Sequence, residues 1–409
     1  MIYTVHKPEI LNADIRLPAS KSISNRVLIL QALSNNIRGV ENISSSDDTQ
    51  VMMQALTNPQ DVIDIKAAGT GMRFLTAYFA TQPGEHVITG TDRMKNRPVA
   101  LLVDALRQIG ADVEYLEKEG YPPLRIRGKK LSGGNISLDG GISSQYISAL
   151  MMIAPVTQNG LEIKLEGQVV SKPYIRMTQC LMETFGITIS RADSIISIPP
   201  QAYRPVPFTI ESDWSAASYW YEMLSLSAEG SKIVLRGLHK QSLQGDAKIA
   251  QLFEALGVTT TFTEHGVILQ QTERIVSPFI YNFQHEPDLA QTFVVTCALK
   301  NIPFHFTGLQ SLKIKETDRI LALQNEMKKL GYDIQAANES EMSWTGVRSQ
   351  VSTILPIRTY EDHRMAMSFA PAAIVFGEMD IQDPEVTGKS YPSYWEDLEK
   401  SGFTIHKRT

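Results

Sequence analysis

The chain has little of several features that mark specialised classes of protein. Its 409 residues include only two cysteines, Cys180 and Cys297, and both lie in apolar helical patterns. We therefore interpret them as core residues rather than a disulfide, metal ligands or a nucleophile. No apolar run approaches the roughly 18 residues of a membrane span. The N-terminus lacks the basic start and apolar core of a signal peptide, so we expect a cytoplasmic protein.

Strong charge of one sign is also absent. The net charge is −5 and no basic block occurs, so we expect no nucleic-acid partner. With 43% hydrophobic and 20% charged residues, the composition is that of a globular protein long enough for two domains. Its cations are therefore expected to serve local sites.

A repeat of about 70 residues runs along the chain. Five glycines are separated by 76, 71, 74 and 71 residues: Gly110, Gly186, Gly257, Gly331 and Gly402. Each is predicted to follow an amphipathic helix, at 98–109, 173–185, 246–256, 317–330 and 392–401. Strands are predicted after each glycine, at 113–115, 187–189, 259–262, 332–334 and 403–405. The repeating unit is thus helix, strands and a second helix.

Second helices are predicted to begin near six residues: Ser22, Thr70, Ser143, Ser215, Asp288 and His363. This gives six α+β units if the N-terminal strand and first helix complete the short C-terminal piece, while the first unit has lost a strand pair. We expect two domains of three units each, one at 20–211 and a discontinuous one at 1–19 plus 212–409. The active site is expected in the cleft between them.

The first of these helices begins with two cations, Lys21 and Arg26. A helix N-terminus is already positive, so cations there are unfavourable unless an anion binds. Further cations, hydroxyls and two acids recur at the equivalent helix starts and adjoining loops. They are Ser22, Gly69, Thr70, Arg73, Arg93, Arg97, Ser143, Ser144, Gln145, Ser171, Lys172, Asp288, Lys315, Glu316, Arg319, Arg364 and Lys389. The pattern predicts a pocket for small substrates with two anionic groups.

Seven motifs, in this order, resemble those of the 5-enolpyruvylshikimate-3-phosphate (EPSP) synthase family along essentially the whole chain. They lie at 17–22, 68–73, 92–98, 143–145, 170–174, 315–319 and 362–367. The resemblance implies an α/β enolpyruvyl transferase fold of two domains, each with three βαβαββ-type units around buried parallel helices. It also implies a monomer, with no metal or organic cofactor.

By the same resemblance, the substrates are divided between two sets of residues. Phosphoenolpyruvate is expected to contact Lys21, Gly69, Arg97, Gln145, Arg319, Arg364 and Lys389. Shikimate 3-phosphate is expected to contact Lys21, Ser22, Arg26, Ser143, Ser144, Gln145, Ser171, Tyr174, Asp288 and Lys315. Arginine forks match carboxylate and phosphate oxygens, which suits this division.

The reaction implied by the resemblance transfers the enolpyruvyl group to the 5-hydroxyl and releases phosphate, by addition and then elimination. Asp288 is the candidate to accept the hydroxyl proton, although it could also cap the following helix. Glu316 is the candidate to protonate the methylene carbon, and Lys21 could share the proton transfers. The sequence leaves open the protonation state of Glu316, since neighbouring cations and burial act on its pKa in opposite directions.

Three positions depart from the family pattern: Ala67 and Ser311 stand where asparagine is usual, and Phe74 where proline is common. Gly69 leaves room for the inhibitor glyphosate, but these departures leave its potency open. Two other functions are compatible with parts of the pattern. A UDP-N-acetylglucosamine enolpyruvyl transferase usually carries a cysteine in the loop corresponding to 93–97, which has none here. A non-catalytic binding relative is disfavoured by Asp288 and Glu316.

Overall fold

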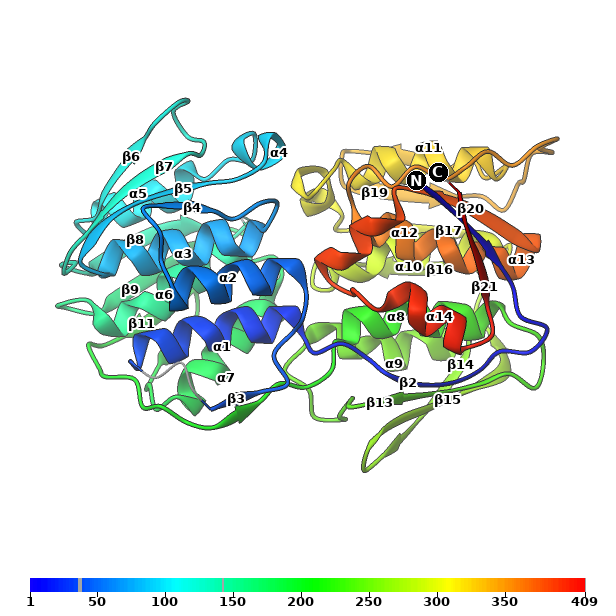
Figure 1. Ribbon diagram of the computed structural model, residues 1–409, viewed down its shortest axis with the longest axis horizontal. Helices are drawn as coiled ribbons and strands as arrows, with labels where there is room; N and C mark the ends of the chain where they lie inside the picture. Colours follow the sequence, from blue (N-terminus) through cyan, green and yellow to red (C-terminus); the bar gives the residue numbers. More distant parts are fainter. Residues whose placement is uncertain (36–38, 142, 409) are drawn as a thin grey trace. The chain divides into compact units, whose positions relative to one another are not determined.

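The computed structural model describes residues 1–35, 39–141 and 143–408. The chain divides into two compact units (Figure 1). Unit 1 comprises Met1–Pro18 with Glu211–Thr409, and unit 2 comprises Ala19–Ile210. Within the described residues, no helix is both long and apolar enough to cross a membrane.

Four sheets have the same four-stranded topology, two in each unit. The first two strands of each sheet in chain order are parallel, and the last two form an antiparallel hairpin whose second strand pairs with the second strand of the sheet. In unit 2 the strands are β4 (Val62–Asp64), β5 (Gly84–Thr89), β6 (Asp112–Tyr115) and β7 (Leu124–Gly128), then β8 (Gly134–Asp139), β9 (Leu161–Glu166), β10 (Ser190–Ala192) and β11 (Ile195–Ile198). In unit 1 they are β2 (Asn12–Arg16), β13 (Lys232–Arg236), β14 (Leu256–Thr263) and β15 (Gly266–Ile275), then β16 (Phe279–Asn282), β17 (Phe304–Thr307), β18 (Gln335–Ala337) and β19 (Glu341–Trp344). The predicted repeat is therefore confirmed.

The other two sheets explain the exceptional units. Strand β1 (Ile2–His6) lies between β20 (Glu378–Gln382) and β21 (Thr404–Arg408), antiparallel to both, so the two ends of the chain lie side by side (Figure 1). The N-terminal strand thus completes the last unit, as predicted. In unit 2, β3 (Val40–Glu41) pairs with β12 (Phe208–Thr209), and among the described residues this two-residue ladder stands where the other units have longer sheets.

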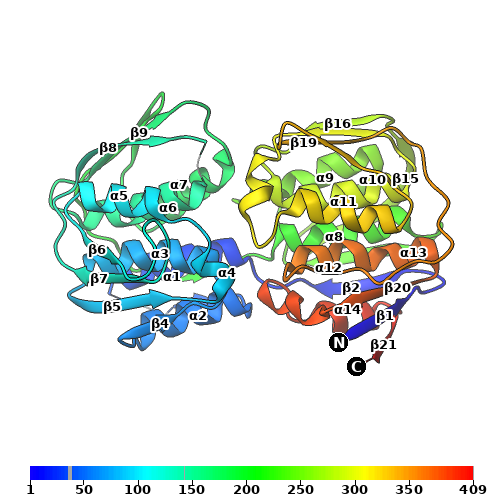
Figure 2. The same cartoon turned by 90° about the horizontal axis from the view of Figure 1, so that it is seen from above.

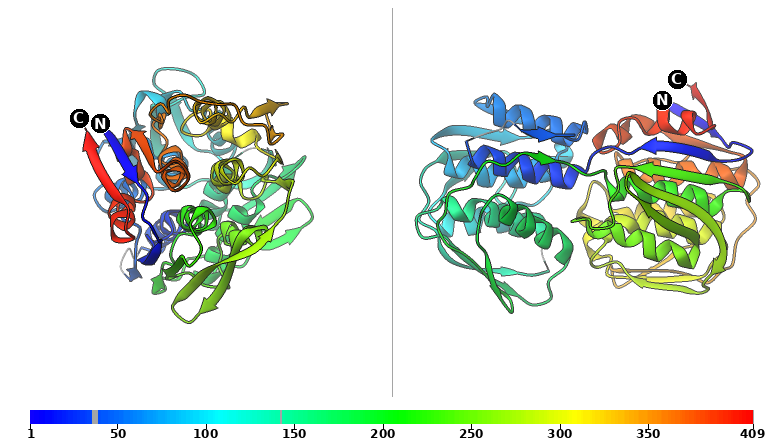
Figure 3. Two further views of the ribbon diagram at one scale, coloured as in Figure 1. Left: turned by 90° about the vertical axis from the view of Figure 1, so that its right-hand side faces the viewer. Right: turned by 90° about the horizontal axis from the view of Figure 1, so that it is seen from below.

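Three inner helices form the centre of each unit, and strands lie at its outside (Figures 2 and 3). They are α1 (Lys21–Leu33), α3 (Gly69–Thr81) and α6 (Ser144–Ile153) in unit 2, and α8 (Trp214–Leu226), α10 (Ala290–Leu299) and α12 (His363–Phe369) in unit 1. Nearly all their residues are buried, and their first residues lie within two positions of the six predicted helix starts.

The other helices bury one face. They are α2 (Asp47–Thr57), α4 (Asp92–Lys95), α5 (Ala100–Gln108), α7 (Lys172–Thr184), α11 (Arg319–Lys329), α13 (Ala373–Phe376) and α14 (Tyr394–Lys400).

The recurring glycine ends a helix in four of the five repeats. Gly186 and Gly331 have φ of 84° and 89°, and the next residue donates its N–H to a carbonyl five residues back. In this C-terminal motif the residue after the glycine packs on the helix, and only glycine adopts such a φ without strain. Ile187 and Tyr332 are buried in that role, so the strands predicted at 187–189 and 332–334 in fact begin three residues later, at β10 and β18.

The prediction at Gly257 is wrong. The segment 246–256 is not one helix but three short turns, η2 (Gly245–Lys248), α9 (Ile249–Leu252) and η3 (Phe253–Ala255). Gly257 lies inside β14 with φ of 87°, at a register irregularity between Leu256 and Val258. Its Cβ would lie 3.0 Å from the Thr272 carbonyl oxygen, so here the glycine permits a bulge.

Candidate active site

The charged side chains of unit 1 gather at the N-terminal ends of its helices. Asp288 lies in the turn η4 (Pro287–Leu289) before α10. Lys315 and Glu316 follow the turn η5 (Gln310–Ile314), and Arg319 begins α11. Arg364 is the second residue of α12, and Lys389 ends the turn η7 (Pro384–Lys389). The repeat therefore brings six predicted site residues, all from unit 1, into one cluster.

Arg319 is the centre of this cluster. Its side chain is 1% exposed and contacts three carboxylates. Nη1 lies 3.2 Å from Asp288 Oδ1, Nη2 lies 2.9 Å from Glu316 Oε2, and Nε lies 2.7 Å from Asp362 Oδ2. Burial by itself lowers the pKa of Arg319, but the three carboxylates outweigh it and raise the pKa well above its usual value. A permanently charged fork therefore fixes both candidate proton-transfer groups.

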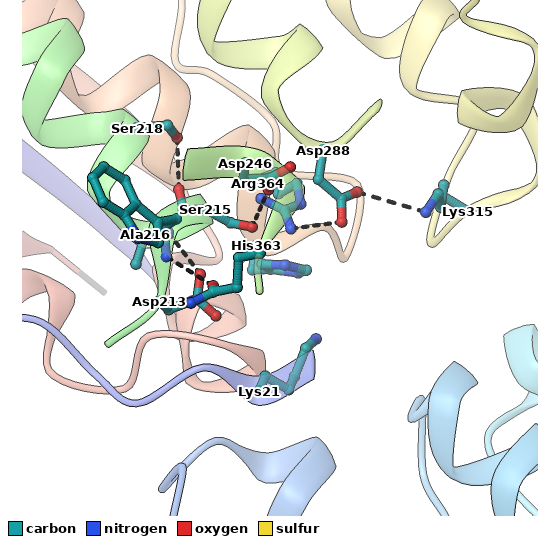
Figure 4. Close-up of polar contacts among 12 residues, drawn as sticks. Lys21, Asp213, Ser215, Ala216, Ser218, Asp246, Asp288, Lys315, His363 and Arg364 are labelled. Carbon is teal, nitrogen blue, oxygen red and sulfur yellow. Dashed lines mark hydrogen bonds and ion pairs between the residues drawn. The ribbon is translucent and has the colours of Figure 1, made fainter. Parts of the chain in front are cut away.

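Asp288 is held by three cations, two of which, Arg364 and Lys315, are labelled in Figure 4. Arg364 Nη2 lies 3.0 Å from Oδ2, while Lys315 Nζ lies 3.6 Å from Oδ1, which Arg319 also contacts. Burial would raise the pKa of Asp288, but these cations together hold it well below its usual value. Asp288 does not cap the following helix, because the residue at that position is Leu289. Its carboxylate is therefore ionised, and a weak base while the cations face it.

Glu316 is held from both sides. Its Oε1 lies 3.2 Å from Lys389 Nζ, and its Oε2 contacts Arg319. Burial lowers the pKa of the adjacent Lys315, although the negative charge of Asp288 acts to raise it. The cluster thus pairs cations that match anionic substrates with two acids suited to proton transfer.

Two carboxylates of this cluster were not predicted as site residues. Asp362 is fully buried and caps α12, accepting from the Arg364 backbone N–H at 2.9 Å. It lies in one of the seven motifs, which was the available signal. Asp246 is 3% exposed and accepts a hydrogen bond from Ser215 Oγ (Figure 4). Burial and the nearby charge of Asp288 raise the pKa of Asp246 to about 7. No sequence pattern indicated this residue, since it lies in the mispredicted helix.

In unit 2, Lys21 is oriented by a third unpredicted carboxylate. Lys21 begins α1, which Ser20 caps by accepting from the Ile23 N–H. Its Nζ lies 3.0 Å from Oδ2 of Asp48, whose side chain is 6% exposed and lies in the first turn of α2. The ammonium group is thereby fixed at the end of an inner helix.

Gly69 begins α3 directly against Arg97. A Cβ at Gly69 would lie 2.6 Å from Arg97 Nη1, closer than two such atoms can approach. Arg73 supports the same region by donating to the Gly69 carbonyl at 3.0 Å and the Pro98 carbonyl at 3.2 Å. The absence of a side chain at Gly69 therefore leaves the space that the Arg97 guanidinium occupies.

Hydroxyl and amide donors come from the remaining helix starts of unit 2. Ser143 caps α6, with Ser144 as its first residue, and Gln145 donates to Thr70 Oγ1 at 3.2 Å. Ser171 precedes α7 with a left-handed φ of 52°. Tyr174 follows on α7, and Ser22 accepts from Arg26 Nη1 through its carbonyl oxygen at 2.8 Å. Unit 2 thus carries Lys21, Gly69, Arg97 and all the neutral donors predicted for the site.

Metal ligation has no candidate in the part of the chain that the structure describes. No three His, Cys, Asp or Glu residues there are grouped to hold an ion. Cys180 and Cys297 are free thiols, and burial raises the pKa of Cys297 far above its usual value. The buried Cys297 thiol is therefore protonated at neutral pH and is not a nucleophile.

Comparisons with known proteins identify similar sequences and folds. A family model described as EPSP synthase (3-phosphoshikimate 1-carboxyvinyltransferase) matches residues 5–58 and 56–398. A 3-phosphoshikimate 1-carboxyvinyltransferase of Bacteroides fragilis is 56% identical over 406 residues, covering 99% of each chain. One from Vibrio cholerae is 34% identical and covers 96% of this chain and 97% of its own. The EPSP synthase structure of Acinetobacter baumannii is 20% identical, with a TM-score of 0.77 over the whole of both chains, and shows the same fold.

Proposed function

Since this chain belongs to the EPSP synthase family and is an enzyme with that family's carboxyvinyl transferase activity, we propose which of its side chains perform the transfer. The substrates are phosphoenolpyruvate and shikimate 3-phosphate, and the products are 5-enolpyruvylshikimate 3-phosphate and phosphate. The observation that carries the assignment is the cluster around Arg319, in which Asp288 and Glu316 share one buried guanidinium.

Phosphoenolpyruvate is bound by the cations of this cluster together with residues of unit 2. Arg319, Arg364 and Lys389 of unit 1 pair with carboxylates in the structure, and an anionic substrate would compete for them. In unit 2, Lys21, Gly69, Arg97 and Gln145 complete this set.

Shikimate 3-phosphate is bound mainly by unit 2. Its phosphate and hydroxyl groups suit the donors already described, which are Lys21, Ser22, Arg26, Ser143, Ser144, Gln145, Ser171 and Tyr174. Asp288 and Lys315 of unit 1 complete the set, with the Asp288 carboxylate accepting a hydrogen bond from the 5-hydroxyl.

Substrate binding would make Asp288 a stronger base. While Arg364 and Lys315 face Asp288, its pKa stays low and it is a poor proton acceptor. When substrate anions draw these cations away, burial dominates and the pKa of Asp288 rises. The same competition would free Glu316 from Lys389 and allow it to carry a proton.

The transfer then needs two balanced steps. Asp288 takes the proton of the 5-hydroxyl as that oxygen bonds to the central carbon of phosphoenolpyruvate, and Glu316 gives a proton to the methylene carbon. In the second step the methyl group returns that proton to the Glu316 carboxylate, the carbon–carbon double bond reforms, and the carbon–oxygen bond to phosphate breaks. Lys21 stabilises the departing phosphate and shares the proton transfer.

The test is phosphate release by the purified protein with each substrate omitted in turn, and with UDP-N-acetylglucosamine as another acceptor. Release should need both phosphoenolpyruvate and shikimate 3-phosphate. Asp288→Asn and Glu316→Gln should each lower kcat by at least about a hundredfold. The matched controls Asp14→Asn and Glu339→Gln remove exposed carboxylates paired with Arg236 and Lys313, and should keep full activity. Unchanged turnover in either site variant would refute its role.

We further propose that the protein is a cytoplasmic monomer. Both thiols are free, which fits a reducing compartment, and the two units together carry every residue the proposed site needs. Light scattering on the purified protein and fractionation of cells would test the two statements.

A further inference from the structure

Arg26 is a buried cation whose charge is not balanced by a carboxylate. Its side chain is 2% exposed, and no acidic group of the described residues lies within ion-pair distance of it. Its donors instead meet neutral oxygens. Nε donates to Thr178 Oγ1 at 2.7 Å, and Nη2 to Ser148 Oγ at 3.3 Å. Burial lowers the pKa of Arg26 to about 10, so the guanidinium remains charged at neutral pH.

Two aromatic rings face this guanidinium. Its central carbon lies 5.3 Å from the centroid of Phe74 on α3 and 5.8 Å from that of Tyr174 on α7. The negative faces of aromatic rings attract a cation, and the attraction is larger where water is excluded. Phe74 is fully buried, so its ring is held by the core of unit 2 and cannot turn away with Arg26. These rings offset part of the cost of burying the charge.

We propose that Phe74 is a positioning residue that fixes the Arg26 guanidinium, before substrate arrives, in the orientation that binds shikimate 3-phosphate. The inference rests on the proposed function, in which Arg26 is a ligand of that substrate. Thr178 Oγ1, Ser148 Oγ and the Ser22 carbonyl oxygen accept hydrogen bonds at the edge of the guanidinium, but they place no group over its flat face. The ring of Phe74 lies over that face and restrains tilting of the guanidinium.

An arginine already held in its binding orientation loses less freedom when the ligand binds. Phe74→Leu keeps an apolar side chain but removes the ring face. We expect the Kd for shikimate 3-phosphate, measured by calorimetry on the intact protein, to rise about threefold to tenfold. The KM for phosphoenolpyruvate at saturating shikimate 3-phosphate should stay within twofold.

Phe79→Leu is the matched control. Phe79 lies on the same helix, is 3% exposed, and packs against Tyr78 and His86 rather than Arg26. Phe79→Leu makes the same chemical change in the same core. Because its ring packs away from Arg26, this variant should leave the Kd for shikimate 3-phosphate unchanged. Phe74→Met, which preserves more of the volume, serves if Phe74→Leu does not fold. Equal Kd values for the Phe74 and Phe79 variants would overturn the proposal.

A second readout does not depend on the substrate. Hydrogen exchange at Arg26 Nε, followed by NMR and assigned with Arg26→Lys, should be slow in the wild type and at least about tenfold faster in Phe74→Leu. Unchanged exchange would show that the ring does not order Arg26. If the wild type fails to bind shikimate 3-phosphate, the proposed function fails and the effect on affinity fails with it. The exchange comparison still decides whether Phe74 holds Arg26.

Discussion

Arg364 and Asp288 form an ion pair, with Nη2 3.0 Å from Oδ2, so a proposed ligand of phosphoenolpyruvate restrains the proposed base. Arg364 also donates to the Tyr219 hydroxyl at 3.3 Å, which leaves it anchored at a second point. The pairing makes the basicity of Asp288 depend on where Arg364 lies. With the proposed roles, binding of the donor and activation of the acceptor would thereby be coupled.

Removing the charge of Arg364 should shift the pH dependence of turnover. In Arg364→Gln, burial acts on Asp288 with less opposition, so its pKa rises. Since the base must be ionised and Arg364 faces it in the free enzyme, the acid limb of the kcat/KM profile should move up by about one pH unit or more. Arg364→Lys keeps the charge and should leave that limb near its wild-type position. A limb that moves equally in both variants would contradict the coupling.

Gly69→Ala should weaken phosphoenolpyruvate binding more than turnover. The new Cβ would meet Arg97 Nη1 at 2.6 Å and displace the guanidinium. Because small misplacements of a positioning group are costly, the KM for phosphoenolpyruvate should rise at least about tenfold. Gly71→Ala is the control on the same helix, where the nearest contact is Ala68 Cβ at 3.3 Å. Equal KM values for the two variants would show that the approach of Arg97 is unimportant.

Asp246→Asn should change how stability depends on pH. The folded-state pKa of Asp246 is about 7 against an ordinary value of 3.8, so the folded protein binds the proton more tightly. Asp246 therefore favours folding most below pH 4, and this contribution is lost as pH rises from about 4 to 7. Asp246→Asn cannot titrate and so does not lose this contribution. The free energy of unfolding of the variant minus that of the wild type, from urea unfolding, should therefore increase over this window by a few kcal/mol at most. A constant difference from pH 4 to 8 would argue against a raised pKa.

Asp48→Asn should lower kcat through Lys21. The amide cannot hold the ammonium group at 3.0 Å by charge, so Lys21 loses its orientation and kcat should fall about tenfold. Asp47→Asn removes the neighbouring charge in the same first turn of α2, and so controls for the effect on the helix. If both variants lose the same activity, the helix terminus and not the Lys21 contact is responsible.

The sequence predicted the inner helices well and some outer elements less well. Caps such as Ser20 and the apolar runs after them are local, so the six helix starts fall within two residues of their predicted positions. The helix at 246–256 failed because its apolar spacing looks helical, whereas the bulge at Gly257 arises from pairing with β15. The residues that pair across this hairpin lie beyond the span of a helical turn, so the apolar spacing within 246–256 does not report the pairing.

The sequence by itself determined the repeat, the inner helices and the positions of the candidate substrate-binding residues at the helix starts, because apolar periodicity and chain turns are encoded locally. Only the tertiary structure showed that one guanidinium, Arg319, contacts three carboxylates. It also showed that Asp48 pairs with Lys21 and that Asp246 lies close enough to Asp288 for the charge of one to raise the pKa of the other. It also decided the direction of each pKa shift. Those shifts are sums of burial and of charges from segments far apart in the chain, and such sums exist only once the chain has folded.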